Sequence, residues 1–120
     1  MLAYIKENLL AFKERRFAKR RMAAMLKSHA AVRAEMPELS DLALYKEVLL
    51  RTPSIDPSAV DQILWQAEDS VDEWTARGTG KLGFRQLVTF VIMSQYRAAG
   101  NVGTVVSLKE IVYARIPEDL

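Results

Sequence analysis

Residues 2–36 read LAYIKENLLAFKERRFAKRRMAAMLKSHAAVRAEM, and no glycine or proline interrupts the chain before Pro37. Apolar residues at the start recur every three or four positions, as on one face of an α-helix: Leu2, Ile5, Leu9 and Phe12. A second set restores this spacing further along: Met22, Met25, Leu26, Val32 and Met36. We therefore predict helix over residues 2–36, either as one long helix or as two shorter ones, because nothing in the segment forces a break.

The rest of the chain shows helical spacing in shorter segments separated by turn residues. We predict helices over about 41–51, from 57 to near 78, over 84–99 and over 107–115. The strongest start signal is Asp56 followed by Pro57, because proline fits the first position of a helix. Residues 81–83 and 103–106 also fit a small two-stranded element. The predicted fold class is all-α, with four or five helices in a single domain over residues 1–120.

Charge is divided unequally along the chain. Residues 1–36 contain nine Lys or Arg and three Asp or Glu, whereas residues 37–120 contain eight and twelve. The net formal charge of +2 conceals this division. We predict a basic amphipathic segment, 1–36, joined to an acidic helical body, 37–120. Such a segment indicates a partner, which could be a lipid surface, a nucleic acid, another protein or the body itself.

The composition excludes several classes of protein. Cysteine is absent, which excludes disulfides, thiolate metal sites and a cysteine nucleophile. No apolar run approaches the roughly 20 residues that span a bilayer, and the first residues lack the pattern of a secretory signal. We therefore predict a cytoplasmic location. Half of the residues are hydrophobic, which is enough to form a buried core.

The sequence offers little support for catalysis or metal binding. His29 is the only histidine, and the adjacent Ser28 points about 100° away on a helix, so the two cannot act as base and nucleophile. We expect His29 to border the apolar stripe. Residues 74–88 resemble an EF-hand in their spacing of helix, glycine-centred loop and helix, but lack the carboxylates that bind calcium. We predict no enzyme, no metal site, no cofactor and no small-molecule substrate.

Four cations share one side of the predicted N-terminal helix. Arg15 and Lys19, like Arg16 and Arg20, are neighbours at i and i+4. Together with nearby apolar residues they form the candidate partner-binding site: Leu9, Phe12, Arg15, Arg16, Phe17, Lys19, Arg20 and Met22. Such a helix can bind phosphates, lie on an anionic membrane or fill a groove in a partner protein. It can equally be a solvated surface that keeps the protein in solution.

The acidic body has its own concentrated patch near the end of the third predicted helix: Glu68, Asp69, Asp72 and Glu73. Like charges at i and i+4 are mildly unfavourable, as are acids at the negative end of a helix dipole. The patch is either an ordinary solvated face or one neutralised by the basic segment, within one chain or between two. Trp65 lies off the apolar stripe of this helix. We expect it to pack against another helix, and an interface is the alternative.

These patterns favour a non-enzymatic protein-interaction module, either an adaptor or a self-associating protein, that docks through its N-terminal helix. The alternative is a nucleic-acid-binding protein that uses the cations from Arg15 to Arg21, and a membrane surface is a less favoured partner. The docking hypothesis predicts that the apolar stripe of residues 2–36 is buried against another chain or exposed as a contiguous apolar patch. A stripe packed wholly inside one monomer would rule the hypothesis out.

Overall fold

The computed structural model describes the backbone of residues 2–74, 81–101 and 105–120, and the side chains of residues 12–71, 81–101 and 108–120. Five α-helices and one short 3₁₀ turn make up the described part: α1 (Leu2–Glu35), α2 (Asp41–Arg51), η1 (Pro57–Ala59), α3 (Val60–Trp74), α4 (Phe84–Ala98) and α5 (Val105–Arg115). The described residues contain no strand. The predicted all-α class is confirmed.

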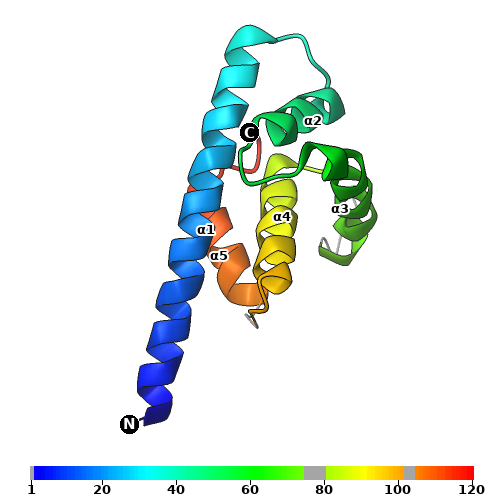
Figure 1. Cartoon of the computed structure of the whole chain (residues 1–120). Coiled ribbons are helices and arrows are strands. Elements are labelled where there is room, and N and C mark those ends of the chain that lie inside the picture. Colours follow the sequence, from blue (N-terminus) through cyan, green and yellow to red (C-terminus); the bar gives the residue numbers. More distant parts are fainter. Residues whose placement is uncertain (1, 75–80, 102–104) are drawn as a thin grey trace.

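The helices are arranged around α4, which lies between α1 on one side and α3 on the other (Figure 1). Helix α1 packs against α2, α4 and α5, whereas α3 packs against α2 and α4. At 1.5 Å per residue α1 is about 51 Å long, close to the longest dimension of the molecule, 54 Å. Its first turns project beyond the other helices. The radius of gyration, 14.8 Å, accordingly exceeds the roughly 13.6 Å of a compact domain of this length.

Residues 2–35 form one helix, which decides between the two alternatives that the sequence left open. The cationic run between the apolar stripes does not break the helix, because Lys, Arg, Glu and Ala are all good helix formers. The helix ends at Glu35, and Met36 precedes Pro37, a position that disfavours helical backbone. No helix in the described part of the chain is long and apolar enough to cross a membrane.

The start of the third helical segment confirms the predicted cap. The Asp56 carboxylate accepts a hydrogen bond from the backbone N–H of Ser58 at 3.0 Å, and Pro57 begins the helical turn. Ile55 and Val60, on either side of this turn, are both buried in the core. The first turn is 3₁₀ rather than α, so α3 itself begins at Val60.

The predicted strand pair is wrong where the structure describes it. Residues 81–83 have no regular secondary structure, and α5 begins at Val105, so residues 105–106 are helical. Residues 103–104 lie outside the described part. The β-branched valines cost a helix only a few tenths of a kcal/mol. Burial of Leu108 and Val112 on α5, and of Ile116 directly after it, outweighs that preference.

The core confirms most of the predicted apolar stripes. In α4, every residue of the predicted face is at most 2% exposed: Phe84, Leu87, Val88, Val91 and Ile92. The second stripe of α1 is divided, because Met22, Met25 and Val32 are buried, Leu26 is half-buried and Met36 is exposed. Among the side chains that the structure describes, the second predicted stripe contributes to the core and the first does not.

His29 lies inside the core rather than at its border. Its side chain is 5% exposed, and its ring centroid is 4.4 Å from that of Phe84. The Nε2 atom is buried without a hydrogen-bond partner among the described residues. Burial, and to a lesser extent the positive charge of Arg33, lower the pKa of His29 below its ordinary value. The folded protein therefore binds a proton at His29 less readily than the unfolded chain does.

This shift predicts loss of stability in mild acid. Above about pH 6.5, the ordinary pKa of histidine, His29 is neutral in both states. As the pH falls below that value the unfolded chain takes up the proton first, so the free energy of unfolding decreases until the pH reaches the lowered pKa of the folded state. We expect His29→Leu to remove this decrease. Urea titrations at pH 7 and pH 5 measure it, and equal pH dependence in the two proteins would contradict the prediction.

Candidate functional site

Two of the cations on α1 are bound to the body. Lys13 Nζ donates to Asn101 Oδ1 at 2.7 Å, and Arg21 Nε donates to Gln95 Oε1 at 2.8 Å. Gln95 Nε2 in turn donates to the carbonyl of Ser54 at 3.0 Å. Helix α1 is thus connected to the C-terminal end of α4 and, through Gln95, to the loop between α2 and η1.

The end of α4 explains how Asn101 reaches α1. Gly100 adopts φ 81°, its N–H donates to the carbonyl of Arg97, and the N–H of Asn101 donates to the carbonyl of Tyr96. These two hydrogen bonds form a Schellman motif, in which glycine supplies the left-handed backbone. The turn directs the chain toward α1 and places Asn101 opposite Lys13.

Phe17 joins α1 to α4 between the two bound cations. Its ring meets Tyr96 edge-on, with centroids 5.0 Å apart and an interplanar angle of 80°. The guanidinium of Arg21 lies 3.5 Å from the centroid of the Phe17 ring. Burial, followed by repulsion from Arg20, lowers the pKa of Arg21. Burial, followed by the charge of Glu14, raises the pKa of Tyr96.

The remaining four cations of this region, Arg15, Arg16, Lys19 and Arg20, form a basic ridge. All four side chains are exposed, and none has an ion pair or a hydrogen-bond partner among the described residues. Arg16 lies two positions after Glu14, and Arg20 lies two positions after Ala18; both Glu14 and Ala18 are buried. They therefore point about 200° away from the buried face, into solvent.

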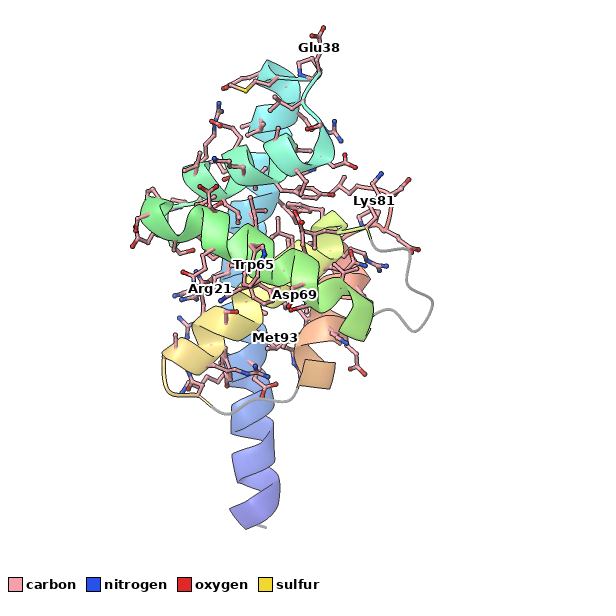
Figure 2. All side chains as sticks on the ribbon, turned by 90° about the vertical axis from the view of Figure 1, so that its right-hand side faces the viewer. Arg21, Glu38, Trp65, Asp69, Lys81 and Met93 are labelled. Carbon is pink, nitrogen blue, oxygen red and sulfur yellow. The ribbon has the colours of Figure 1, made fainter. Side chains whose placement is uncertain are left out.

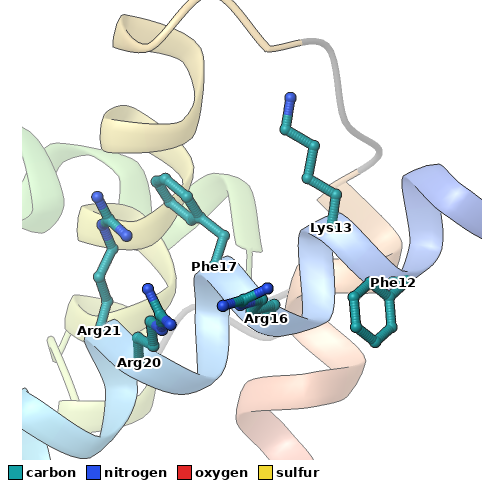
Figure 3. A pocket seen from close by; sticks show the side chains of 6 residues that line it. All are labelled: Phe12, Lys13, Arg16, Phe17, Arg20 and Arg21. Carbon is teal, nitrogen blue, oxygen red and sulfur yellow. The ribbon is translucent and has the colours of Figure 1, made fainter.

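Phe12 extends the ridge. It is 63% exposed and forms a row with Arg16 and Arg20 at i, i+4 and i+8. A hollow of about 270 Å³ lies on one side of this row, lined also by Lys13, Phe17 and Arg21. Figure 3 shows Phe17 and Arg21 directed toward α4, whereas Phe12 points away from α4.

A second hollow, of about 320 Å³, shares Phe12, Arg16 and Arg20 and adds Arg15 and Lys19. The exposed row thus has a groove on each side, and all of the lining residues belong to α1. In helix–helix packing, a row of side chains at i, i+4 and i+8 forms a ridge, and side chains of the second helix fill the grooves on either side of it.

The structure separates the residues that the sequence grouped as one site. Phe12 and the four cations of the basic ridge share an exposed surface. Phe17 is half-buried against Tyr96. Met22 is 1% exposed and belongs to the core, so its side chain is not part of this exposed surface. Leu9 lies on α1, but its side chain is outside the described part.

The predicted acidic patch lies on α3. Glu68 and Asp69 are exposed, and no ion pair among the described residues joins them to the basic ridge. The side chains of Asp72 and Glu73 lie outside the described part. Near the start of the same helix, Asp61 pairs with Lys46 of α2 at 3.0 Å and still remains 80% exposed.

The structure contradicts the expectation that Trp65 packs against another helix. Its side chain is 67% exposed on α3. Leu64, Ala67 and Val71, on the apolar stripe of the same helix, are buried. The sequence signal that could have identified this exposure is the position of Trp65 off that stripe.

A third cavity, of about 400 Å³, lies where α1, α2, the start of α4 and the C-terminal residues meet. Its lining includes Arg33, Asp41, Lys81, Glu118 and Asp119. Lys81 Nζ lies 3.2 Å from a carboxylate oxygen of Asp41, so part of this charge is neutralised internally. The described residues contain no group of three or more His, Asp or Glu side chains that could hold a metal ion. Comparison of the chain with protein-family models, with curated proteins and with solved structures finds no match.

Proposed function

We propose that this protein is a non-enzymatic interaction module that docks through the exposed face of α1 onto an acidic, helical surface of a protein partner. The observation that carries the proposal is the row Phe12–Arg16–Arg20, an exposed aromatic side chain in line with two cations that have no partner among the described residues. Exposed aromatic groups combined with arginine are typical of the residues that dominate protein–protein interfaces.

The grooves beside this row favour a helix over a nucleic acid as the partner. Binding to the phosphates of a duplex needs cations, and the paired, stacked bases of a duplex leave no open face for an exposed phenylalanine. A helix can place side chains in both grooves, bury Phe12 and bring carboxylates to the basic ridge. The charges then orient the partner, while burial of the apolar side chain supplies affinity. Location in the cytoplasm and the absence of catalytic activity belong to the same proposal.

The test is binding of the full chain to three defined probes by fluorescence anisotropy: a designed amphipathic helix of Leu and Glu, a random-sequence DNA duplex and vesicles containing anionic lipid. We expect the acidic helix to bind most tightly. Arg16→Ala combined with Arg20→Ala should weaken that binding about tenfold. Phe12→Ala should weaken it by a similar factor, because the ring becomes buried in the complex.

The matched control removes two exposed cations elsewhere, Lys27→Ala with Arg115→Ala. It changes the net charge equally and should leave binding nearly unchanged. Tighter binding to the duplex, with a steep loss between about 0.05 and 0.2 M salt, would replace the proposal with the nucleic-acid function. Equal loss in the control variant would also contradict docking at this surface, since the effect would then follow net charge alone.

A further inference from the structure

The exposed face of α3 carries a tryptophan and carboxylates, whereas the exposed face of α1 carries a phenylalanine and cations. Trp65, Glu68 and Asp69 are spaced i, i+3 and i+4, so they lie together on the solvent side of the helix. Figure 2 shows Trp65 and Asp69 on α3, nearest the viewer, with α1 behind the body. An exposed tryptophan with carboxylates beside it complements an exposed row of phenylalanine and arginines.

These two surfaces cannot meet within one molecule. Helix α4 lies between α1 and α3 (Figure 1), and the basic ridge points away from the body, as shown by the burial of Glu14 and Ala18 on the opposite side of α1. Of the two forms of neutralisation that the sequence left open, the one within a single chain is therefore excluded for the described residues. Carboxylates from another molecule can reach Arg16 and Arg20, whereas Glu68 and Asp69 of the same molecule cannot.

We propose that a second copy of this chain is a partner, and that the basic ridge of one copy docks on the Trp65–Glu68–Asp69 face of the next. This inference rests on the proposed function and names its partner. Trp65 would enter a groove beside the Phe12–Arg16–Arg20 row, where its ring can lie against a guanidinium. Glu68 and Asp69 would pair with the cations of the basic ridge.

The positions of the two faces determine the kind of assembly. A two-fold dimer needs one self-complementary patch, whereas here each copy offers two different patches on opposite sides of the molecule. Contacts between unlike patches run head to tail, so each added copy leaves one ridge and one α3 face open. We therefore expect growth beyond a dimer, into open chains or closed rings.

Sedimentation velocity at low ionic strength, over a series of protein concentrations, tests the assembly. The wild-type chain should show a mass that rises with concentration beyond that of a dimer and falls when salt is added. A ridge-reversed variant, Arg16→Glu with Arg20→Glu, should remain monomeric. A face-reversed variant, Glu68→Lys with Asp69→Lys, should also remain monomeric.

Mixing the two reversed variants provides the decisive measurement. In the mixture the carboxylates introduced at positions 16 and 20 of one variant can pair with the lysines introduced at positions 68 and 69 of the other, and the unaltered basic ridge and α3 face also match. An equimolar mixture should therefore associate although neither variant does alone. The control Lys27→Glu with Arg115→Glu reverses two charges at other exposed sites and should associate like wild type.

Two outcomes would overturn the inference: a wild-type chain that stays monomeric at every concentration, or reversed variants that fail to associate when mixed. Growth that stops at a dimer would overturn the head-to-tail arrangement. These failures are distinguishable from failure of the proposed function, because binding of the designed acidic helix to the basic ridge is measured separately. A monomeric protein that binds that probe would retain the docking function and lose the second copy as its partner.

Discussion

Replacing Phe84 with alanine should lower the free energy of unfolding by about 3–5 kcal/mol. Phe84 is fully buried at the start of α4. Its ring lies 4.4 Å from that of His29 on α1 and 6.0 Å from that of Tyr45 on α2, measured between centroids. The side chain therefore connects three helices, and its removal leaves a cavity that none of them can fill alone.

The loss is large relative to the total stability of the protein, because a domain of 120 residues typically has about 6–18 kcal/mol in all. Urea denaturation followed by circular dichroism measures it. The matched control is Phe12→Ala, the same chemical change at a side chain that is 63% exposed. We expect that control to alter the free energy of unfolding by no more than about 0.5 kcal/mol. Similar losses in the two variants would show that Phe84 does not connect the helices as described.

Phe17→Ala should cause a smaller but still substantial loss of stability, about 2–3 kcal/mol. The change removes partial burial of the ring, its edge-on contact with Tyr96 and its cation–π contact with Arg21. Because these contacts hold the middle of α1 on α4, we also expect faster amide hydrogen exchange in residues 12–21 than in the C-terminal part of α1. Denaturation and exchange measured together would separate local loosening from global loss of stability.

Tyr96→Phe is the corresponding control. Its hydroxyl is buried without a hydrogen-bond partner among the described residues, so removing it keeps the ring contact and relieves an unsatisfied polar group. We expect stability to be unchanged or slightly increased. A loss as large as that of Phe17→Ala would mean that the hydroxyl, rather than the contact between the rings, holds α1 in place.

The sequence predicted correctly those features of the helices that depend on only a few neighbouring residues. Asp56 caps its helical turn as predicted, because a cap depends on groups within three positions along the chain. The apolar face of α4 was also predicted, since helical spacing alone identifies it. The prediction was wrong at residues 105–106, where contacts of α5 with α1 and α4 outweigh the weak strand preference of valine.

The candidate site was predicted less completely. Phe12 and Phe17 lie in the same basic segment, yet one is exposed and the other packs on Tyr96. In the sequence, nothing distinguishes Lys13 and Arg21 from the cations between them. Only the fold brings their partners, Asn101 and Gln95, beside α1. Those partners lie 88 and 74 positions away along the chain, a separation over which the sequence pattern carries no information.

From the sequence alone it follows that the protein is helical, that residues 2–36 are a basic helical segment and that carboxylates collect on the third helical segment. Each of these follows from spacing or composition over a few turns. The fold was needed to show which cations between Lys13 and Arg21 have partners among the described residues, and that the basic ridge and the Trp65 face lie on opposite sides of the molecule. The physical reason is the position of α4, whose burial between α1 and α3 determines which side of each helix remains turned toward solvent.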